Sequence, residues 1–242
     1  MRRILLINAN TSSEITERLV EMGNAIAPEG VRFLGATARF GARYIASRAA
    51  SAVAAHAALD CYAEHGAGAD AVLLGCFGDP GLDALKEVAP VPVLGLAEAA
   101  AQAALAIAPR FGVVTGGAAW GPMLREFFAG RGQAAALAGM RTVAPTGGEM
   151  ARDPDGAAAL LAAACRACAE QDGAGVVILG GAGLAGFAAR VADRVAVPVL
   201  CSVETGLRGA IAALGRQRAD MLPHRPVETI GLSPALARML SG

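Results

Sequence analysis

An internal repeat is the feature that most restricts the fold of this chain. Residues 72–100, VLLGCFGDPGLDALKEVAPVPVLGLAEAA, resemble residues 176–206, VVILGGAGLAGFAARVADRVAVPVLCSVETG. Each segment holds an apolar run, a glycine-rich turn, a helical pattern, the letters VPVL and then a glutamate. Near the start, RRILLINANTSSEITERL likewise parallels PRFGVVTGGAAWGPMLREF, which begins at residue 109. A repeat of this length predicts two copies of one structural unit.

The pattern inside each copy indicates the fold class. Short apolar runs alternate with longer helical patterns, and several runs are apolar throughout, as is typical of parallel strands buried on both faces. We therefore predict an α/β fold with two pseudo-symmetric, doubly wound subdomains, parallel sheets and an active site in the cleft between them. The first subdomain is expected over residues 1–107 and the second over 108–210, with 211–242 packing back on the first. The expected strands are 3–8, 31–37, 71–76, 91–96, 111–116, 175–181 and 197–203, with helices at 12–26, 45–66, 80–88, 97–107, 120–130, 155–171, 184–194 and 204–215.

Charge and composition exclude several classes of protein. The 242 residues carry 21 Lys and Arg against 21 Asp and Glu, and no basic stripe stands out, so nucleic-acid binding is not expected. No stretch has the length and apolarity of a membrane span. The N-terminal apolar run stops at Asn8, too early for a secretory signal, and the five cysteines are odd in number, which does not favour disulfides. We expect a cytoplasmic protein.

Polar and glycine residues follow the predicted strands where a parallel sheet would bind its ligand. Ligands of such sheets sit beyond the carboxyl ends of the strands. The residues at those ends are Asn8–Thr11, Cys76, Thr115–Gly117 and Gly181–Gly183. These four segments are the candidate site.

Cys76 lies between a strand and the expected start of a helix. Asp79 is a good N-cap, Pro80 suits the first helical position and Asp83 falls in the first turn. The positive end of the helix dipole would favour a thiolate at Cys76, which would help proton abstraction or nucleophilic attack. The alternative interpretation is a small residue packed under the sheet.

The stretch NANTS at 8–12 offers hydrogen-bond donors before another helix. Asn10, Thr11 and Ser12 bring side-chain donors, and the helix N-terminus brings free backbone N–H groups, a combination that binds a carboxylate or a ring carbonyl. Ordinary helix capping is the competing interpretation. TGG at 115–117 occupies the matching place in the second copy, where glycines allow a ligand oxygen to approach the backbone.

Two motifs elsewhere resemble cofactor or metal sites but have simpler explanations. GAGLAG at 181–186 fits a dinucleotide-binding fingerprint, with Glu204 further on. The same turn in the first copy is CFGDPG, which is no phosphate loop, so the repeat accounts for the glycines. Cys165 and Cys168 form a CxxC on an alanine-rich helix with no second ligand pair, which favours core packing.

The remaining polar candidates carry weaker signals. The three histidines are scattered and match no metal or triad spacing, so we expect them to be structural or solvent-facing. In GARYIAS at 41–47, Arg43 and Tyr44 either contact substrate or belong to a plain junction between loop and helix. The histidines are His56, His65 and His224.

Taken together, GCFGDPGL, INANTS and VPVLGLAEAA resemble the aspartate/glutamate/hydantoin racemase superfamily, on its hydantoin and allantoin racemase side. The resemblance covers most of the chain. It implies two α/β subdomains related by a pseudo-twofold axis, no cofactor, a small substrate with carboxylate or ring carbonyls, and a homo-oligomer. It also implies two facing cysteines, one of which removes the proton next to a carbonyl while the other returns a proton from the opposite face.

The resemblance assigns Cys76 as the first cysteine and departs from the family at the second. Gly181 stands where the second cysteine is expected, and glycine has no proton to give. Three alternatives follow: a racemase or epimerase whose second acid comes from elsewhere, with Cys201 as the first choice; a one-thiol decarboxylase or lyase; or a non-catalytic ligand-binding relative. The substrate-binding residues implied are Asn8, Asn10, Thr11, Phe77, Gly78, Thr115, Gly116, Gly117, Ala182 and Gly183.

Overall fold

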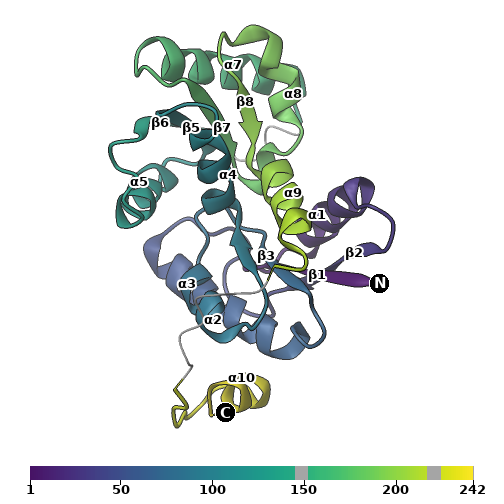
Figure 1. Cartoon of the computed structure of the whole chain (residues 1–242). Coiled ribbons are helices and arrows are strands. Elements are labelled where there is room, and N and C mark those ends of the chain that lie inside the picture. The colour runs from purple at the N-terminus through teal and green to yellow at the C-terminus, as the bar shows by residue number, and fades with distance from the viewer. Residues whose placement is uncertain (145–151, 217–224, 242) are drawn as a thin grey trace. The chain divides into compact units, whose positions relative to one another are not determined.

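The structure, a computed structural model, describes residues 1–144, 152–216 and 225–241. It divides into two units: Met1–Gly95 with Leu207–Gly242, and Leu96–Gly206 (Figure 1). The range 1–107 that we expected for the first subdomain included a helix at 97–107, and the structure groups that helix with the second unit. Each unit has its own sheet and its own core.

A four-stranded parallel sheet with the order β2-β1-β3-β4 forms the centre of the first unit. The two inner strands are apolar and almost fully buried, as the sequence predicts for strands covered on both faces. The strands are β1 Arg2–Asn8, β2 Val31–Thr37, β3 Ala71–Leu74 and β4 Val93–Gly95, and the helices are α1 Ser13–Ile26, α2 Arg48–His65, α3 Leu82–Val88 and α10 Pro234–Ser241.

The second unit repeats this arrangement with the strand order β6-β5-β7-β8, again entirely parallel. Because the two orders correspond strand by strand, the prediction of two α/β units with parallel sheets is confirmed. Its strands are β5 Phe111–Gly116, β6 Leu137–Val143, β7 Val176–Gly180 and β8 Val199–Cys201, and its helices are α4 Leu96–Leu105, α5 Trp120–Gly130, α7 Pro154–Glu170 and α8 Phe187–Val191. Helix α9, Ser202–Ala213, begins in this unit and ends in the first.

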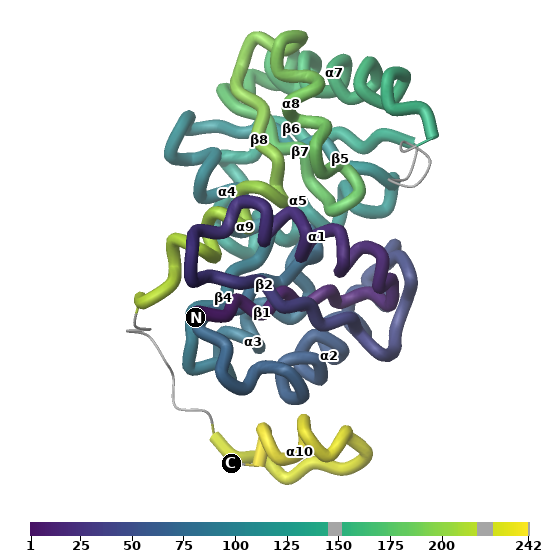
Figure 2. Tube along the Cα trace, turned by 90° about the vertical axis from the view of Figure 1, so that its right-hand side faces the viewer, coloured from purple at the N-terminus to yellow at the C-terminus, as the bar shows by residue number. Residues whose placement is uncertain are grey.

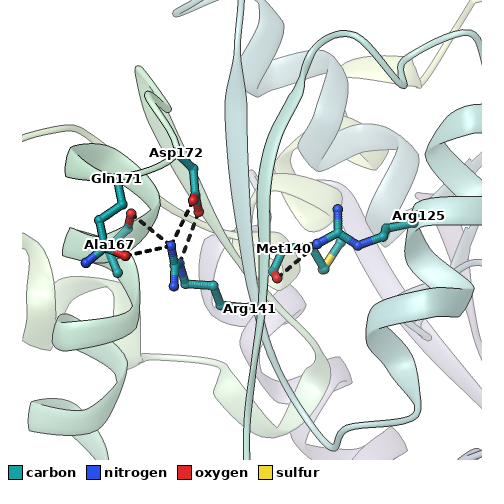
Figure 3. A network of polar contacts seen from close by, with 6 residues as sticks. All are labelled: Arg125, Met140, Arg141, Ala167, Gln171 and Asp172. Carbon is teal, nitrogen blue, oxygen red and sulfur yellow. Dashed lines mark hydrogen bonds and ion pairs between the residues drawn. The ribbon is translucent and has the colours of Figure 1, made fainter.

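Strand β6 is an element that the sequence pattern did not reveal. Its sequence LAGMRTV has no continuous apolar run, and it lies at the edge of its sheet. Arg141 ties it to the end of α7: its Nε and Nη2 donate to the two oxygens of Asp172 at 3.1 and 2.8 Å (Figure 3). The same Nη2 also donates to Gln171 Oε1 and to the carbonyl of Ala167. These contacts tie the strand to the end of α7, in addition to its pairing with β5 and the burial of Met140 and Val143.

Helix α10, which the sequence pattern also missed, packs on α2 within the first unit (Figure 2). Asp60 of α2 is almost fully buried, and its carboxylate accepts hydrogen bonds from Arg39 Nε at 2.6 Å and Arg39 Nη2 at 3.0 Å. The hydrogen bond from Arg39, and a further one from Ser233 just before α10, hold the pKa of Asp60 below its ordinary value. This cluster therefore stabilises the fold above the ordinary pKa of aspartate, and that contribution is lost as acid protonates the carboxylate.

Candidate functional site

In each sheet the strand order reverses between the two central strands, and the predicted site residues gather at that point. Doubly wound sheets bind their ligands beyond the carboxyl ends of the strands at such a reversal. In the first unit Asn8 ends β1 and Cys76 follows β3, with the backbone N–H of Gly75 donating to the carbonyl of Ile7 at 2.7 Å. In the second unit Thr115 lies near the end of β5 and Gly181 follows β7.

The turn after Cys76 differs from the predicted helix start. Helix α3 begins at Leu82, so the prediction that Asp79 caps it and that Pro80 is its first residue is wrong. Three residues of the turn are left-handed instead: Gly78, Asp79 and Gly81, with φ of 108°, 49° and 84°. The backbone N–H of Asp79 donates to the carbonyl of Cys76 at 3.0 Å. This tight turn takes up the residues that the capping pattern assigned to the helix.

The thiol of Cys76 is buried, and its surroundings favour the neutral form. Its exposed fraction is 8%, and burial, together with the nearby carboxylate of Asp79, raises its pKa to about 12. Both effects oppose the thiolate that a position before a helix was expected to favour. The helix whose dipole would stabilise a thiolate begins only at Leu82, while desolvation penalises the charge at Cys76 directly.

Asp79→Asn is expected to lower the pKa of Cys76. Asparagine keeps the shape of the side chain and tolerates the left-handed backbone, while it removes the nearby negative charge. At a fixed pH between 8 and 10, the rate of iodoacetamide alkylation at Cys76, followed by peptide mass spectrometry, should rise by about tenfold for each unit of pKa lost. The exposed Asp83→Asn is the matched control and should leave the rate unchanged. Equal rates in the Asp79 variant and the parent protein would contradict this electrostatic coupling.

In the loop after β1, the side chains of Asn10 and Thr11 are half-buried, whereas Asn8 at the end of the strand is fully buried. The amide Nδ2 of Asn8, which carries two N–H groups, lies within hydrogen-bonding distance of three acceptors: Asn10 Oδ1 at 3.0 Å, the Ser12 carbonyl at 2.9 Å and Thr16 Oγ1 at 3.1 Å. Ser12 precedes α1 without a capping hydrogen bond from its side chain, so the capping interpretation of this stretch is wrong for its hydroxyl. Asn10 Oδ1 accepts instead from the backbone N–H of Ser12 at 2.9 Å, so the side chain of Asn10 orders the turn before α1.

In the second unit, the hydroxyl groups of Thr115 and Ser202 make hydrogen bonds to the backbone of the candidate segments. Thr115 Oγ1 donates to the carbonyl of Gly180 at 2.8 Å, and the backbone N–H of Gly181 donates to Ser202 Oγ at 3.1 Å. Ser202 is fully buried at the start of α9, and the sequence analysis missed it. The repeat carried a signal for it, because Ser202 aligns with the apolar Leu96 of the first copy.

Glycine at position 181 has backbone angles that other residues rarely adopt. Its φ is +122° and its ψ is 143°. Among the residues that the structure describes, a Cβ added there would have Thr115 Oγ1 as its nearest contact, at 3.8 Å, while the backbone is unfavourable for any L-residue. Gly186 has a left-handed backbone, and it occupies the same position before α8 that Gly81 occupies before α3. Gly181 and Gly186 therefore have a conformational explanation.

The other predicted site residues lie close to these. Phe77 is buried and Gly78 half-buried after Cys76, while Gly116 and Gly117 end and follow β5. Cys201 ends β8 and is 8% exposed. In the second unit Ala182 and Gly183 form a single half-buried turn of 3-10 helix directly after Gly181.

Cys165 and Cys168 lie on α7, outside this constellation, whereas Arg43 and Tyr44 follow Ala42, whose carbonyl accepts from the backbone N–H of Thr11 at 3.1 Å. Cys165 and Cys168 have no exposed surface, which confirms their interpretation as core residues, and burial raises their pKa values to about 12 and 11. Within residues 1–144, 152–216 and 225–241, no three His, Cys, Asp or Glu side chains gather as metal ligands, and no helix there is long and apolar enough to cross a membrane. His224 lies outside the described residues. Four of the weaker candidates have exposed side chains: His56, His65, Arg43 and Tyr44.

Comparison with known proteins places this constellation in a family. A family model described as Asp/Glu/hydantoin racemase matches residues 4–210. A hydantoin racemase of Paenarthrobacter aurescens is 35% identical over 221 residues, which cover 89% of this chain and 93% of the relative. The crystal structure of an allantoin racemase from Pseudomonas fluorescens superposes with a TM-score of 0.82 at 30% identity, covering 87% of this chain and 89% of the other.

A more distant likeness concerns the fold alone. A double mutant of arylmalonate decarboxylase, in a liganded crystal form, superposes with a TM-score of 0.68 at 18% identity and covers 99% of both chains. The two-unit architecture is thus shared by racemases and a decarboxylase. The family match extends over both copies of the repeat and includes Cys76, Thr115 and Gly181. The chain therefore belongs to the Asp/Glu/hydantoin racemase family.

Proposed function

We propose that this protein is a cofactor-independent racemase or epimerase that acts on the carbon next to a carbonyl in a hydantoin- or amino-acid-like small molecule. The observation that carries the proposal is the thiol of Cys76, which follows β3 at the reversal of strand order, next to the strand that ends at Asn8. Asn10 and Thr11 supply donors for a carboxylate or ring carbonyl. The similarity to hydantoin and allantoin racemases supports the reaction type.

The proposed chemistry is proton transfer at the substrate carbon. A base removes the Cα proton, the electron pair of the C–H bond moves into the adjacent carbonyl to form an enolate, and an acid returns a proton to the carbon. Hydantoins have a rather acidic Cα–H, which makes a weak base sufficient. The neutral thiol of Cys76 is suited to the returning step, and after donation its thiolate is suited to removal in the next cycle.

A two-face proton transfer also needs a second proton carrier besides Cys76. Gly181 stands at the position that the family resemblance assigns to the second cysteine. We propose Cys201, at the end of β8, as the substitute. If Cys201 fills this role, Cys201→Ser removes inversion and spares proton exchange on the other face.

The protonated state of Cys76 favours one alternative function in particular, a one-thiol decarboxylase. In such a reaction the bond to a carboxylate breaks, CO2 leaves with no base required, and the thiol protonates the resulting enolate on one face. The two functions respond oppositely to pH. Proton removal by Cys76 requires the thiolate, so its rate rises with pH towards the pKa of about 12, whereas protonation by the thiol is level at neutral pH and falls as that pKa is approached.

Hydrogen exchange at the substrate carbon separates these possibilities. The substrate is one enantiomer of 5-benzylhydantoin in deuterated water. If Cys76 is the only proton carrier, the protein should incorporate deuterium with retention faster than it inverts the centre. Deuterium is measured by NMR, inversion by chiral chromatography, and the uncatalysed rates are subtracted. Inversion as fast as exchange would show that a second acid is present. Absence of turnover with hydantoins, amino acids and malonates would overturn the enzymatic proposal.

A further inference from the structure

The amide orientations of Asn8 and Asn10 are determined by backbone N–H groups, which can only donate. The N–H of Ser12 lies 2.9 Å from Asn10 Oδ1, so the oxygen of Asn10 faces inward. The N–H of Asn10 lies 3.2 Å from Asn8 Oδ1, which turns Asn8 Nδ2 towards its three acceptors. A reversed amide at either residue would set donor against donor, and both orientations therefore follow from the loop itself.

Asn8 completes the hydrogen bonding of the Asn10 oxygen. Asn10 Oδ1 accepts from both Ser12 N and Asn8 Nδ2, the latter at 3.0 Å, so both of its lone pairs are used within the loop. Among the residues that the structure describes, no hydrogen bond is recorded from Asn10 Nδ2, and this residue is half-buried. Asn10 therefore has two N–H donors and no acceptor left for a ligand.

The network behind the loop resists rotation of either amide. Asn8 has no exposed surface, and its Nδ2 also reaches Thr16 Oγ1 at 3.1 Å. Thr16 Oγ1 lies 2.6 Å from Thr37 Oγ1, which links the loop to the end of β2. Turning Asn10 around would set its NH2 group against Asn8 Nδ2 and the N–H of Ser12, and the N–H of Ser12 would lose its acceptor.

We propose that Asn8 is a positioning residue that holds Asn10 with only its N–H donors turned outward, so that this side of the site selects a ligand oxygen, carboxylate or ring carbonyl, against a ring N–H. The proposal rests on the proposed function for its choice of ligand. It gives Asn8 a role different from the direct contact expected from the sequence. A ligand that presents an N–H at this place would meet donors alone.

A double-mutant cycle tests whether Asn8 acts through Asn10. With 5-benzylhydantoin, Asn10→Ala should lower kcat/KM by roughly 10- to 100-fold, the loss of a hydrogen bond to a charged oxygen. Asn8→Ala should cause a similar loss in the parent protein and less than about a twofold further loss in the Asn10→Ala background, as is typical of coupled residues. Asn24→Ala is the matched control: it removes an asparagine of α1 that bonds the backbone of Phe33, outside this network, and it should leave kcat/KM unchanged. Additive losses would overturn the proposal.

Amide hydrogen exchange at Ser12 tests the same proposal without turnover. The N–H of Ser12 is protected by Asn10 Oδ1, so releasing Asn10 should raise its exchange rate by about tenfold, measured by NMR in Asn8→Ala and Asn10→Ala alike. Asn24→Ala should retain the protection. Unchanged exchange in Asn8→Ala would contradict the positioning role, even in a protein that shows no activity. If no activity is found but Ser12 exchange changes as expected, the proposed function is wrong and the positioning role of Asn8 stands.

A second variant covers the case in which Asn8→Ala does not fold. Asn8→Asp keeps the side-chain shape, and its protonated form can still donate to Asn10 Oδ1, whereas its carboxylate cannot. The proposal predicts that kcat/KM of this variant falls, relative to the parent protein, as pH rises through the pKa of the new carboxyl, and that Ser12 exchange increases over the same range. A constant ratio across pH would overturn it.

Discussion

Replacing Cys76 by alanine is expected to lower kcat/KM by about 10²- to 10⁴-fold, the usual contribution of a positioned general acid or base. The change removes one sulfur atom from a residue that is 8% exposed, and it leaves the turn and the neighbouring Asn10 donors in place. Rates of inversion and of deuterium exchange are measured with one enantiomer of 5-benzylhydantoin. Thermal unfolding shows whether the variant keeps its fold.

The matched control for this loss is Cys61→Ala. Cys61 is a buried cysteine on α2 of the same unit, it is 3% exposed, and burial raises its pKa to about 11. It should retain parental activity, because it lies in a helix away from the carboxyl ends of the strands. If Cys76→Ala also retains activity, Cys76 is a packing residue. A protein that only binds its ligand would keep its affinity in both variants.

Gly181→Cys is expected to raise inversion relative to exchange by as much as about 10²-fold, the low end of the effect of a positioned acid. It places a thiol at the position that the family resemblance assigns to the second cysteine. The structure leaves room for it, since, in the part of the chain that it describes, an added Cβ would have Thr115 Oγ1 at 3.8 Å as its nearest contact. The measurement is the ratio of inverted product to exchanged substrate in deuterated water.

The same substitution should weaken the fold. Because Gly181 has φ of +122°, any L-residue there is expected to cost about 1–3 kcal/mol of unfolding free energy. Gly181→Ala is the matched control, since it carries the same backbone penalty and no thiol. Both variants should lose similar stability in denaturant unfolding, and only the cysteine should raise inversion. An equal rise in both, or in neither, would show that this position is not the second proton site.

Much of the fold could be predicted from the sequence because it depends on local patterns. Continuous apolar runs at 3–8, 71–76, 111–116 and 175–181 are the central strands, since parallel strands covered on both faces need no polar alternation. The repeat then predicted a second α/β unit like the first. Strand β6 was missed because LAGMRTV has no continuous apolar run; its pairing with β5 and the ion pair between Arg141 and Asp172 hold it at the edge of the sheet.

The candidate site, like the fold, could be predicted in part from local sequence patterns. Positions at strand ends could be read directly, because the carboxyl end of a parallel strand is where a ligand binds regardless of what packs around it. The sequence therefore predicted that Cys76, Asn10, Thr115 and Gly181 lie at these ends. The residue types also indicated proton transfer and oxygen recognition.

Only the tertiary structure decided how these residues are disposed to act. The pKa of Cys76 is set by burial and by Asp79, and burial depends on segments that are distant in the chain. The outward donors of Asn10 depend on Asn8, Ser12 and a buried network that reaches Thr37 on β2. A sequence determines which groups are present at the end of a strand, whereas protonation and amide orientation are set by the desolvation and hydrogen bonds that arise only when the chain has packed.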